Sequence, residues 1–364
     1  ADNQNMEPEM MSILEEKLKE FPDRDKYLKK EHDMKLLTLI DKKANNNIEL
    51  TLDELKFLYE IDGKITGFGY EKDPRIEEIK RKRNERRDYS LIFNVKEEEI
   101  ALSQEEWLNN PEKFKFFLGS IDLGSLTSAD GLVLPQHVGG DIFLSHLTNA
   151  DGLVLPESIG GGIYLKSLTS ADGLVLPESI GGGIVLDSLT SADGLVLPQH
   201  VGGYIYLNSL TSADGLVLPE SIDGDIILNS LTSADGLVLP EGIGGDIYLS
   251  SLTSAEGFAF PESIGGSIDL SSLTSADGLI LPQYVGNYIF LSSLTSADGL
   301  VLPQHVGDNI FLNNLRNADG LKLPYDFDLN KLTCPYNIKE EIMNNPDKYY
   351  MAPPTEEDKK EIKR

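Results

Sequence analysis

Apolar residues recur over positions 121–324 in a pattern that repeats every 21 residues. The pentapeptide Gly-Leu-Val-Leu-Pro, or a close variant of it, begins at Gly131 and again at every 21st residue as far as Gly320, ten times without an insertion. One unit, read from Ile163, is IYLKSLTSADGLVLPESIGGG. Such regularity gives every unit an equivalent environment, which a stack of coils provides and a closed globular fold does not.

Two short stretches of each unit alternate with the two-residue period of a β-strand. In the unit above they are residues 163–165 and 174–176. We expect Asp172-Gly173 to form a turn, Pro177 to end the second strand, and the glycines at 160–162 to adopt positive φ at the corner between coils. The inward positions would fill a thin continuous core; they are Ile163, Leu165, Leu168, Ala171, Leu174, Leu176 and Ile180.

The spacing of Leu and Ile over 121–324 resembles that of bacterial leucine-rich repeats, particularly 21-residue units with the pattern LT-S-x-x-G-L-x-LP-E-S-V-G-G. The resemblance implies a scaffold used mainly for recognition and carries no catalytic motif. The predicted fold class is therefore an α+β repeat protein. It is a right-handed parallel β-solenoid of leucine-rich-repeat type, with ten 21-residue coils, a helical N-terminal region and helical end caps.

The segments beside the repeats are suited to cover the ends of the stack, which would otherwise expose unpaired backbone. The first has a capping box from Ser103 to Glu106 and an aromatic second half, and its residues 109–114 share an Asn-Asn-Pro-acid-Lys-aromatic string with residues 344–349. Residues 327–332 keep the first-strand pattern of a shortened terminal coil. The predicted domains are a helical region (1–100), an N-terminal cap (101–120), the solenoid (121–332), and a C-terminal cap with a charged tail (333–364).

Residues 1–100 are a different kind of sequence. Helical spacing of apolar residues predicts helices over 10–21 and 26–43, Thr51 and Glu54 form another capping box, and residues 75–87 predict one highly charged helix. The stretch LTLDELKFLYEIDGKITGFGYEKDPRIEEIKRKRN is similar to a segment of uncharacterised proteins from candidate-phylum bacteria, which implies a bacterial origin and no activity.

The charge of the chain restricts its partners. Its 60 acidic and 32 basic residues give a net charge of -28, and residues 119–330 hold 25 acidic and 3 basic residues, a net of -22. Nucleic acid would be repelled by such a surface. The single cysteine, Cys334, excludes an internal disulfide and a multi-thiolate metal site, and we expect it to pack in the cap. The absence of a long apolar run and of a signal-like start leads us to expect a cytoplasmic protein without a membrane partner, with export by another route left open.

The outward column of the first strand carries six aromatic residues among its ten members. These rings either stabilise neighbouring coils by stacking or form an exposed binding strip, and both roles are compatible. Variation along the column, and along the column one residue earlier, favours a role beyond packing. The predicted partner-binding residues are Phe143, Tyr164, Tyr204, Tyr206, Tyr248, Tyr288, Phe290 and Phe311.

Three other columns receive a structural interpretation. The outward column of the second strand is nearly uniform valine, from Val133 to Val301, which indicates β-propensity or a face buried against the N-terminal helices or another copy of the chain. The aspartates that precede the repeat glycines are suited to accept backbone N–H bonds in their own turns rather than to bind calcium. His137, His200 and His305 lie three and five coils apart and cannot hold one metal ion.

We therefore predict a non-enzymatic protein-recognition scaffold that has no catalytic residue, metal or cofactor and that binds a protein partner with basic residues. Two other classes stay open. One is a structural or self-assembling solenoid that forms homo-oligomers through the valine face, and the other is an enzyme hidden in the N-terminal helices. Carbohydrate binding by the exposed tyrosines also stays open.

Overall fold

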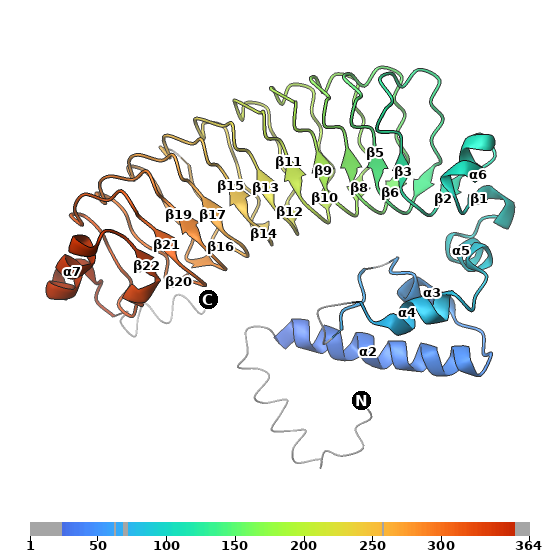
Figure 1. The fold of residues 1–364 in the computed structure, drawn as a ribbon, viewed down its shortest axis with the longest axis horizontal. Helices are drawn as coiled ribbons and strands as arrows, with labels where there is room; N and C mark the ends of the chain where they lie inside the picture. Colours follow the sequence, from blue (N-terminus) through green and yellow to red (C-terminus); the bar gives the residue numbers. More distant parts are fainter. Residues whose placement is uncertain (1–23, 62, 68–71, 257, 354–364) are drawn as a thin grey trace, which may run out of the picture. The chain divides into compact units, whose positions relative to one another are not determined.

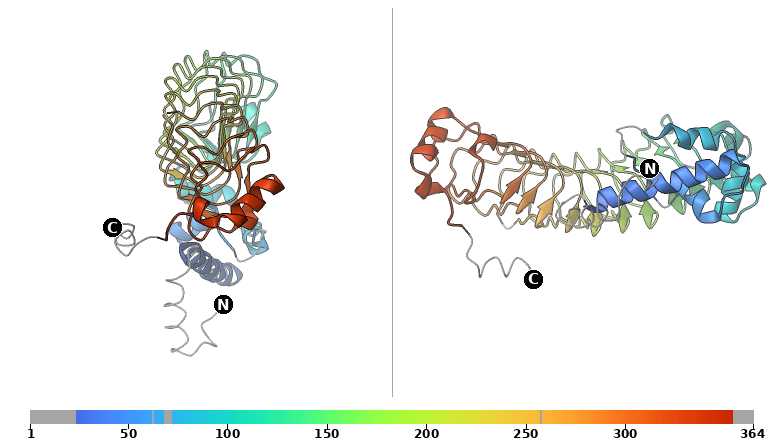
Figure 2. Two further views of the ribbon diagram at one scale, coloured as in Figure 1. Left: turned by 90° about the vertical axis from the view of Figure 1, so that its left-hand side faces the viewer. Right: turned by 90° about the horizontal axis from the view of Figure 1, so that it is seen from below.

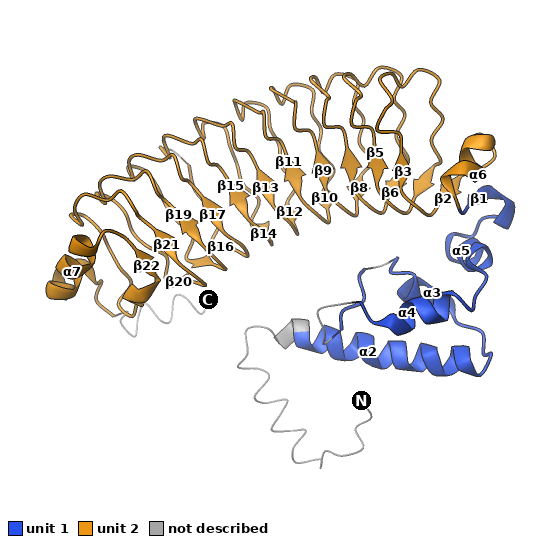
Figure 3. Ribbon diagram, in the orientation of Figure 1, with its two compact units in different colours: residues 1–102 blue, residues 103–364 orange. Residues whose placement is uncertain are grey.

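The chain is described by a computed structural model that covers residues 24–61, 63–67, 72–256 and 258–353. It divides into two compact units, residues 1–102 and 103–364, coloured separately in Figure 3. The helix expected over residues 10–21 lies outside the described residues.

Unit 1 contains short helices packed around one core. Its elements are α2 (Arg24–Asn45), α3 (Leu52–Leu58), α4 (Pro74–Lys80), α5 (Glu85–Phe93), the 3₁₀ turn η1 (Glu97–Glu99) and the two-residue strand β1 (Ile100–Ala101). The helix expected over 26–43 is confirmed by α2. The predicted capping box is confirmed as well, because Thr51 accepts a hydrogen bond from the Glu54 N–H while Glu54 accepts one from the Thr51 N–H.

The prediction of a single charged helix over residues 75–87 is wrong, because this stretch is divided between two helices, α4 and α5. Asp73 caps α4, and Asn84 caps α5 by accepting a hydrogen bond from the Arg87 N–H. An N-cap side chain satisfies the free N–H groups of a new helix, so Asn84 starts a second helix where charge patterning alone suggested continuity.

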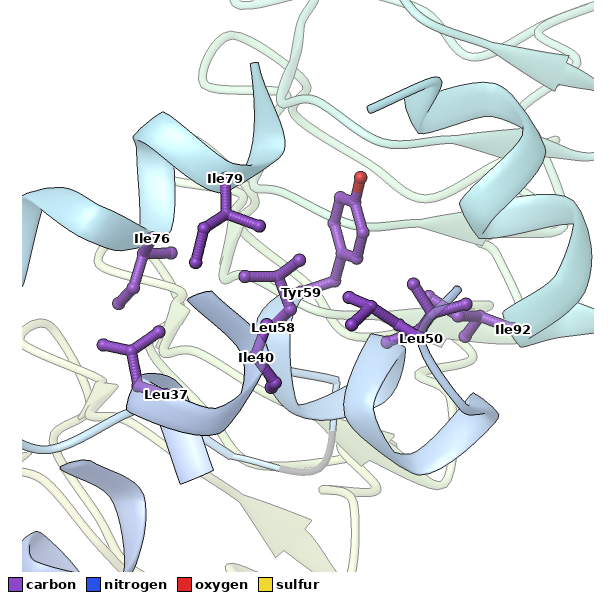
Figure 4. Close-up of a cluster of buried hydrophobic side chains, with 9 residues drawn as sticks. Leu37, Ile40, Leu50, Leu58, Tyr59, Ile76, Ile79 and Ile92 are labelled. Carbon is purple, nitrogen blue, oxygen red and sulfur yellow. The ribbon is translucent and has the colours of Figure 1, made fainter. Parts of the chain in front are cut away.

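The core of unit 1 is an aliphatic cluster around the ring of Tyr59 (Figure 4). The buried carboxylate of Asp88 lies beside the Tyr59 hydroxyl, from which it accepts a 2.9 Å hydrogen bond. It also accepts two hydrogen bonds from the Arg83 guanidinium, at 2.6 and 2.7 Å. A buried charge needs such partners. The cluster consists of Leu37, Ile40, Leu50, Leu55, Leu58, Tyr59, Ile76, Ile79 and Ile92.

Unit 2 is a parallel β-solenoid of ten coils, as predicted. Each coil contributes one two-residue strand to each of two sheets, and neighbouring strands pair in parallel at a spacing of 21 residues, as in Ile163 with Ile184 (Figures 1 and 2). Sheet 1 within this unit consists of β2 (Phe116–Phe117), β4 (His137–Val138), β6 (Ser158–Ile159), β8 (Ser179–Ile180), β10 (His200–Val201), β12 (Ser221–Ile222), β14 (Gly242–Ile243), β16 (Ser263–Ile264), β18 (Tyr284–Val285) and β20 (His305–Val306).

Sheet 2 carries the outward column of aromatic residues. It consists of β3 (Ile121–Asp122), β5 (Ile142–Phe143), β7 (Ile163–Tyr164), β9 (Ile184–Val185), β11 (Ile205–Tyr206), β13 (Ile226–Ile227), β15 (Ile247–Tyr248), β17 (Ile268–Asp269), β19 (Ile289–Phe290), β21 (Ile310–Phe311) and β22 (Leu332–Thr333). Of the seven inward positions predicted for the unit from Ile163, six are buried and Leu176 is half-buried.

The prediction that residues 174–176 form the second strand of the unit is wrong. In that unit the second strand is Ser179–Ile180, and the Leu-Val-Leu segments contribute only isolated bridges, in later coils, such as Ala259 with Ile280. The reason is the distance between coils. The two sheets lie on either side of the glycine corner, where coils approach most closely, whereas the Leu-Val-Leu segments lie outside this region.

The corner glycines allow the backbones of neighbouring coils to approach closely. The expectation that they adopt positive φ is wrong. A Cβ atom on Gly160 would lie 2.5 Å from the carbonyl oxygen of Gly139 in the preceding coil. Positive φ occurs instead at the Asp-Gly turns, where Gly173 has φ 76° and a Cβ would meet no atom within 4 Å. Tight corners and loose turns curve the stack, so that the strands follow its inner side (Figure 1).

The aspartates before these glycines have a turn role, but a different residue supplies the acceptor. The Asp172 N–H donates to the Ser170 hydroxyl at 3.1 Å, and the Leu174 N–H closes the turn on the Ala171 carbonyl at 3.0 Å. A serine or asparagine two residues before the acidic residue accepts the equivalent bond in nine other coils. The Ser-x-Asp-Gly string therefore forms the turn as a unit.

Similar helical caps close both ends of the stack. The N-terminal cap contains α6 (Gln104–Asn109), and the C-terminal cap contains α7 (Tyr336–Asn344) and α8 (Pro346–Tyr349). The shared string forms a turn in the N-terminal cap and helix α8 in the C-terminal cap, but in both a lysine lies over the next, buried ring: Lys113 over Phe114 at 4.7 Å and Lys348 over Tyr349 at 4.9 Å.

Each cap also covers an open sheet edge. The Gln104 side-chain amide exchanges hydrogen bonds with the backbone of Asp122 in β3, at 2.8 and 2.9 Å, while Lys339 donates to the Leu332 carbonyl in β22 at 3.1 Å. The first-strand pattern expected over residues 327–332 is misplaced, because residues 329–331 form η2 (Leu329–Lys331) and the strand of the terminal coil is β22 (Leu332–Thr333), where Leu332 pairs with Ile310.

Candidate functional site

The predicted aromatic column lies outside the hydrophobic core, on the outer side of sheet 2. Its six rings are half-buried without entering the core, and five of them pack against another aromatic ring. The Phe143 and Tyr164 rings stack at 4.5 Å between centroids, and the Phe290 and Phe311 rings stack at 5.0 Å with an interplanar angle of 2°. Stacking between coils and an accessible ring surface therefore coexist in the same residues.

A rigid roof of tyrosines covers β9. The Tyr204 ring lies over Gly183, where a Cβ atom would collide with it, and its hydroxyl is 2.5 Å from the hydroxyl of Tyr164 two coils away. Val185, the outward residue between them, is only 2% exposed as a result. The Tyr206 ring packs beside Tyr204 at 4.3 Å. The structure thus brings Tyr164, Tyr204 and Tyr206 into one cluster, which we call the tyrosine roof.

Two further parts of the predicted site lie farther along sheet 2. Tyr288 is 39% exposed and packs at 5.9 Å from Phe290 and 6.1 Å from Phe311, so these three form a second aromatic cluster. Tyr248 lies in the coil after Ile227 and donates a 2.9 Å hydrogen bond to Asp246.

Carboxylates lie beside some of the rings on this face. Asp225 accepts a hydrogen bond from the Asp246 N–H at 2.8 Å, which fixes its side chain beside the next coil. Burial, followed by the negative charge of Asp225, raises the pKa of Tyr206. The hydrogen bond to Asp246, followed by burial, raises the pKa of Tyr248 to about 12. Both hydroxyls therefore stay neutral at physiological pH, and the carboxylates supply the negative charge of the face.

Sequence reasoning missed a ladder of polar side chains along the other edge of sheet 2. Ser250 donates to Asn229 at 2.7 Å, Asn229 donates to Asn208 at 3.2 Å, and Asn208 donates to Asp187 at 2.7 Å. These residues share the column that follows the inward leucine. Successive Asp, Asn, Asn and Ser at a 21-residue interval were the available signal, because amide side chains 4.8 Å apart can bond along the stack.

The valine column is the most exposed apolar surface of the solenoid. Val154, Val175, Val196, Val217 and Val238 are each 73–74% exposed. Within the described part of unit 2 no segment covers these five valines, so burial of the column against the N-terminal helices or against another copy of the chain stays a prediction. Leu218 and Leu239 line a shallow groove between two neighbouring coils of this face.

The remaining candidate groups do not converge on a reaction centre among the described residues. His137 stacks on Phe116 at 4.3 Å, and burial lowers its pKa. Cys334 is half-buried in the C-terminal cap, and burial raises its pKa. In unit 1 a cavity of about 400 Å³ is lined in part by Arg83 and Asp88, which are already bound to each other.

The described residues contain no group of three or more histidine, cysteine, aspartate or glutamate side chains placed to hold a metal ion. None of their helices combines the length and apolar character needed to span a bilayer.

Comparison with known proteins finds no matching family model, no matching curated protein and no matching solved structure. The geometry described above is therefore the basis for any functional argument.

Proposed function

We propose that this chain is a non-enzymatic protein-recognition scaffold whose binding surface is the outer face of sheet 2. The finer description of the fold as a leucine-rich-repeat solenoid is part of the same proposal, because the repeat pattern and the strand-lined inner side fit that class. The bacterial origin and the cytoplasmic location stay predictions from the sequence.

The observation that carries the proposal is a set of aromatic rings that are fixed in place without being buried. Aromatic residues are enriched at protein interfaces because they supply a large contact area at a small entropic cost. The tyrosine roof loses little freedom on binding, since Tyr204 is already held by Gly183 and by the Tyr164 hydroxyl. The carboxylates between the rings favour a partner with basic residues at the contact.

An affinity capture with matched variants tests this proposal. The bait is the full chain, and the test variant replaces Tyr164, Tyr206 and Tyr248 with serine. The control replaces Val175, Val196 and Val217 with serine, which removes three apolar side chains from the exposed valine column and leaves the aromatic column intact. We expect a partner from a lysate of the source organism to be retained by the wild type and the valine control and lost by the tyrosine variant. Retention by a tyrosine variant with an unchanged circular dichroism spectrum would contradict the proposal.

Self-assembly through the valine column is the second candidate, and the exposure of its valines favours it. Five valines in register on consecutive coils form a continuous apolar strip, which is a common feature of interfaces. The charge of -22 on residues 119–330 opposes contact between two copies, so assembly should strengthen as salt screens this charge. Light scattering at several protein and salt concentrations tests it, and a monomer under all conditions would exclude it.

A further inference from the structure

The most specific chemistry on the recognition face surrounds Tyr206. In the parallel register of sheet 2, Tyr206 pairs with Val185 on one side and with Ile227 on the other. Asp187 lies two residues after Val185, and Asp225 lies two residues before Ile227. The two carboxylates are therefore diagonal neighbours of the same ring, on opposite sides of it and each within about 8 Å.

Both carboxylates are oriented and only partly used. Asp187 accepts the Asn208 amide through Oδ1, at the end of the polar ladder, and Asp225 accepts the Asp246 N–H through Oδ1. Each keeps its Oδ2 for another donor. Lys166 occupies the position before Asp187 in the same column, but none of the ion pairs among the described residues joins these two side chains. The negative charge on both sides of the ring is thus available to a ligand.

We propose that Tyr206, with Asp187 and Asp225 on either side, binds the guanidinium group of an arginine in the partner protein. This inference rests on the proposed function and specifies the chemistry of the partner. A guanidinium is planar, so it stacks on an aromatic face and donates hydrogen bonds in its own plane to acceptors on two sides. A lysine ammonium offers a compact charge without that plane, and it fits two carboxylates on opposite sides of a ring less well.

The surroundings of Tyr206 support the same occupant. On one side the tyrosine roof covers Val185, so the ring lies against a fixed apolar surface. On the other side Ile227 is half-buried and offers an apolar contact to the methylene groups of an arginine side chain. The solenoid of a second copy would bring more carboxylates to these carboxylates, so charge complementarity disfavours it as the occupant.

Peptide binding to the full chain tests the inference. The probe is a fluorescein-labelled Gly-Ser peptide with two arginines, compared with the same peptide carrying lysines or citrullines, by fluorescence anisotropy at low and physiological salt. Asp187→Asn with Asp225→Asn keeps both Oδ1 acceptors and removes two charges. Asp193→Asn with Asp235→Asn is the matched control, because these two aspartates lie at exposed Asp-Gly turns, in the coil of Asp187 and in the coil that follows Asp225.

We expect the arginine peptide to bind about tenfold more weakly to the Asp187→Asn, Asp225→Asn variant and the citrulline peptide to bind about tenfold more weakly to the wild type. The matched control should change affinity by less than about twofold, since diffuse charge contributes little. Tyr206→Phe should retain binding and Tyr206→Leu should lose it. Equal losses in the test and control variants, or equal binding of the lysine peptide, would overturn the assignment.

The same variants separate this inference from the function on which it rests. Suppose that the lysate partner is lost from the tyrosine-to-serine variant but kept by the Asp187→Asn, Asp225→Asn variant. The guanidinium site would then be wrong, while the recognition face would stand. If both variants keep the partner, both proposals fail.

Discussion

The corner glycines and the turn glycines should differ in what an added methyl group does, and the difference can be calculated from the structure. Gly160→Ala would place a Cβ atom 2.5 Å from the Gly139 carbonyl oxygen, so the two coils must separate by about 0.5–1 Å to restore an ordinary contact. That shift lengthens the 2.8 Å bond from the Gly160 N–H to the Val138 carbonyl beyond the normal range, and it also weakens the 3.1 Å bond from the Gly161 N–H to the Gly140 carbonyl, which joins the same two coils.

Two weakened hydrogen bonds at about 1 kcal/mol each, together with about 1–3 kcal/mol for overpacking, predict a loss of about 3–5 kcal/mol in the free energy of unfolding. Gly173→Ala meets no atom, and only its φ of 76° is unfavourable, which predicts about 1–2 kcal/mol. Gly173→Asn should lose less than Gly173→Ala, because asparagine tolerates this conformation better. Urea unfolding followed by circular dichroism measures the series. A Gly160→Ala variant as stable as Gly173→Ala would refute the argument that close approach sets the corner.

Three further predictions concern the caps and the titrating groups. Gln104→Ala should lower the free energy of unfolding by about 1–3 kcal/mol and raise the aggregation rate, because it uncovers the edge of β3. Urea unfolding and light scattering measure the two effects, and an unchanged aggregation rate would contradict a capping role. Burial alone would raise the pKa of Asp33, but hydrogen bonds from Lys29 and Thr66 outweigh burial and lower this pKa in the folded protein. The ionised Asp33 therefore stabilises the fold above its unfolded pKa of 3.8, and this stabilisation is lost as pH falls through its folded pKa. The loss of helicity during acid titration should therefore be less steep in Asp33→Asn than in the wild type, and identical curves for the two proteins would refute this role of Asp33. Asp246→Asn should lower the pKa of Tyr248 from about 12 towards 10, seen by ultraviolet difference titration against Tyr248→Phe.

The repeat pattern predicted the architecture because ten units constrain one another. Inward leucines such as Leu165 could be assigned from spacing alone, since any position that repeats every 21 residues faces the same neighbour in the next coil. The location of the second strand could not be assigned in this way. Residues 174–176 alternate like a strand, yet pairing depends on the distance between coils, and that distance is set by backbone contacts at the glycine corner rather than by side-chain alternation.

The candidate site was only partly predictable for a similar reason. Alternation along a strand correctly placed Tyr164 and Tyr206 outside the core, because Ile and Leu on either side face inward. It could not show that Tyr204 would cross a coil to cover Val185. That contact requires a glycine at position 183, and the significance of this glycine depends on a ring that comes 21 residues later.

The ten coils also act as an internal alignment in which constancy and burial can be compared. Constant columns such as the inward leucines are buried, so packing accounts for them, and varied columns lie on the outer face of sheet 2, where stacking tolerates Asp, Val, Ile and aromatic residues alike. The valine column breaks this relation because its five consecutive valines from Val154 to Val238 are identical and yet 73–74% exposed. Strand propensity is a weak account of it, since these valines lie largely outside the two sheets. The exposed strip therefore needs either a partner or a role in the extended backbone, and serine variants on this column distinguish the two by affecting association or stability.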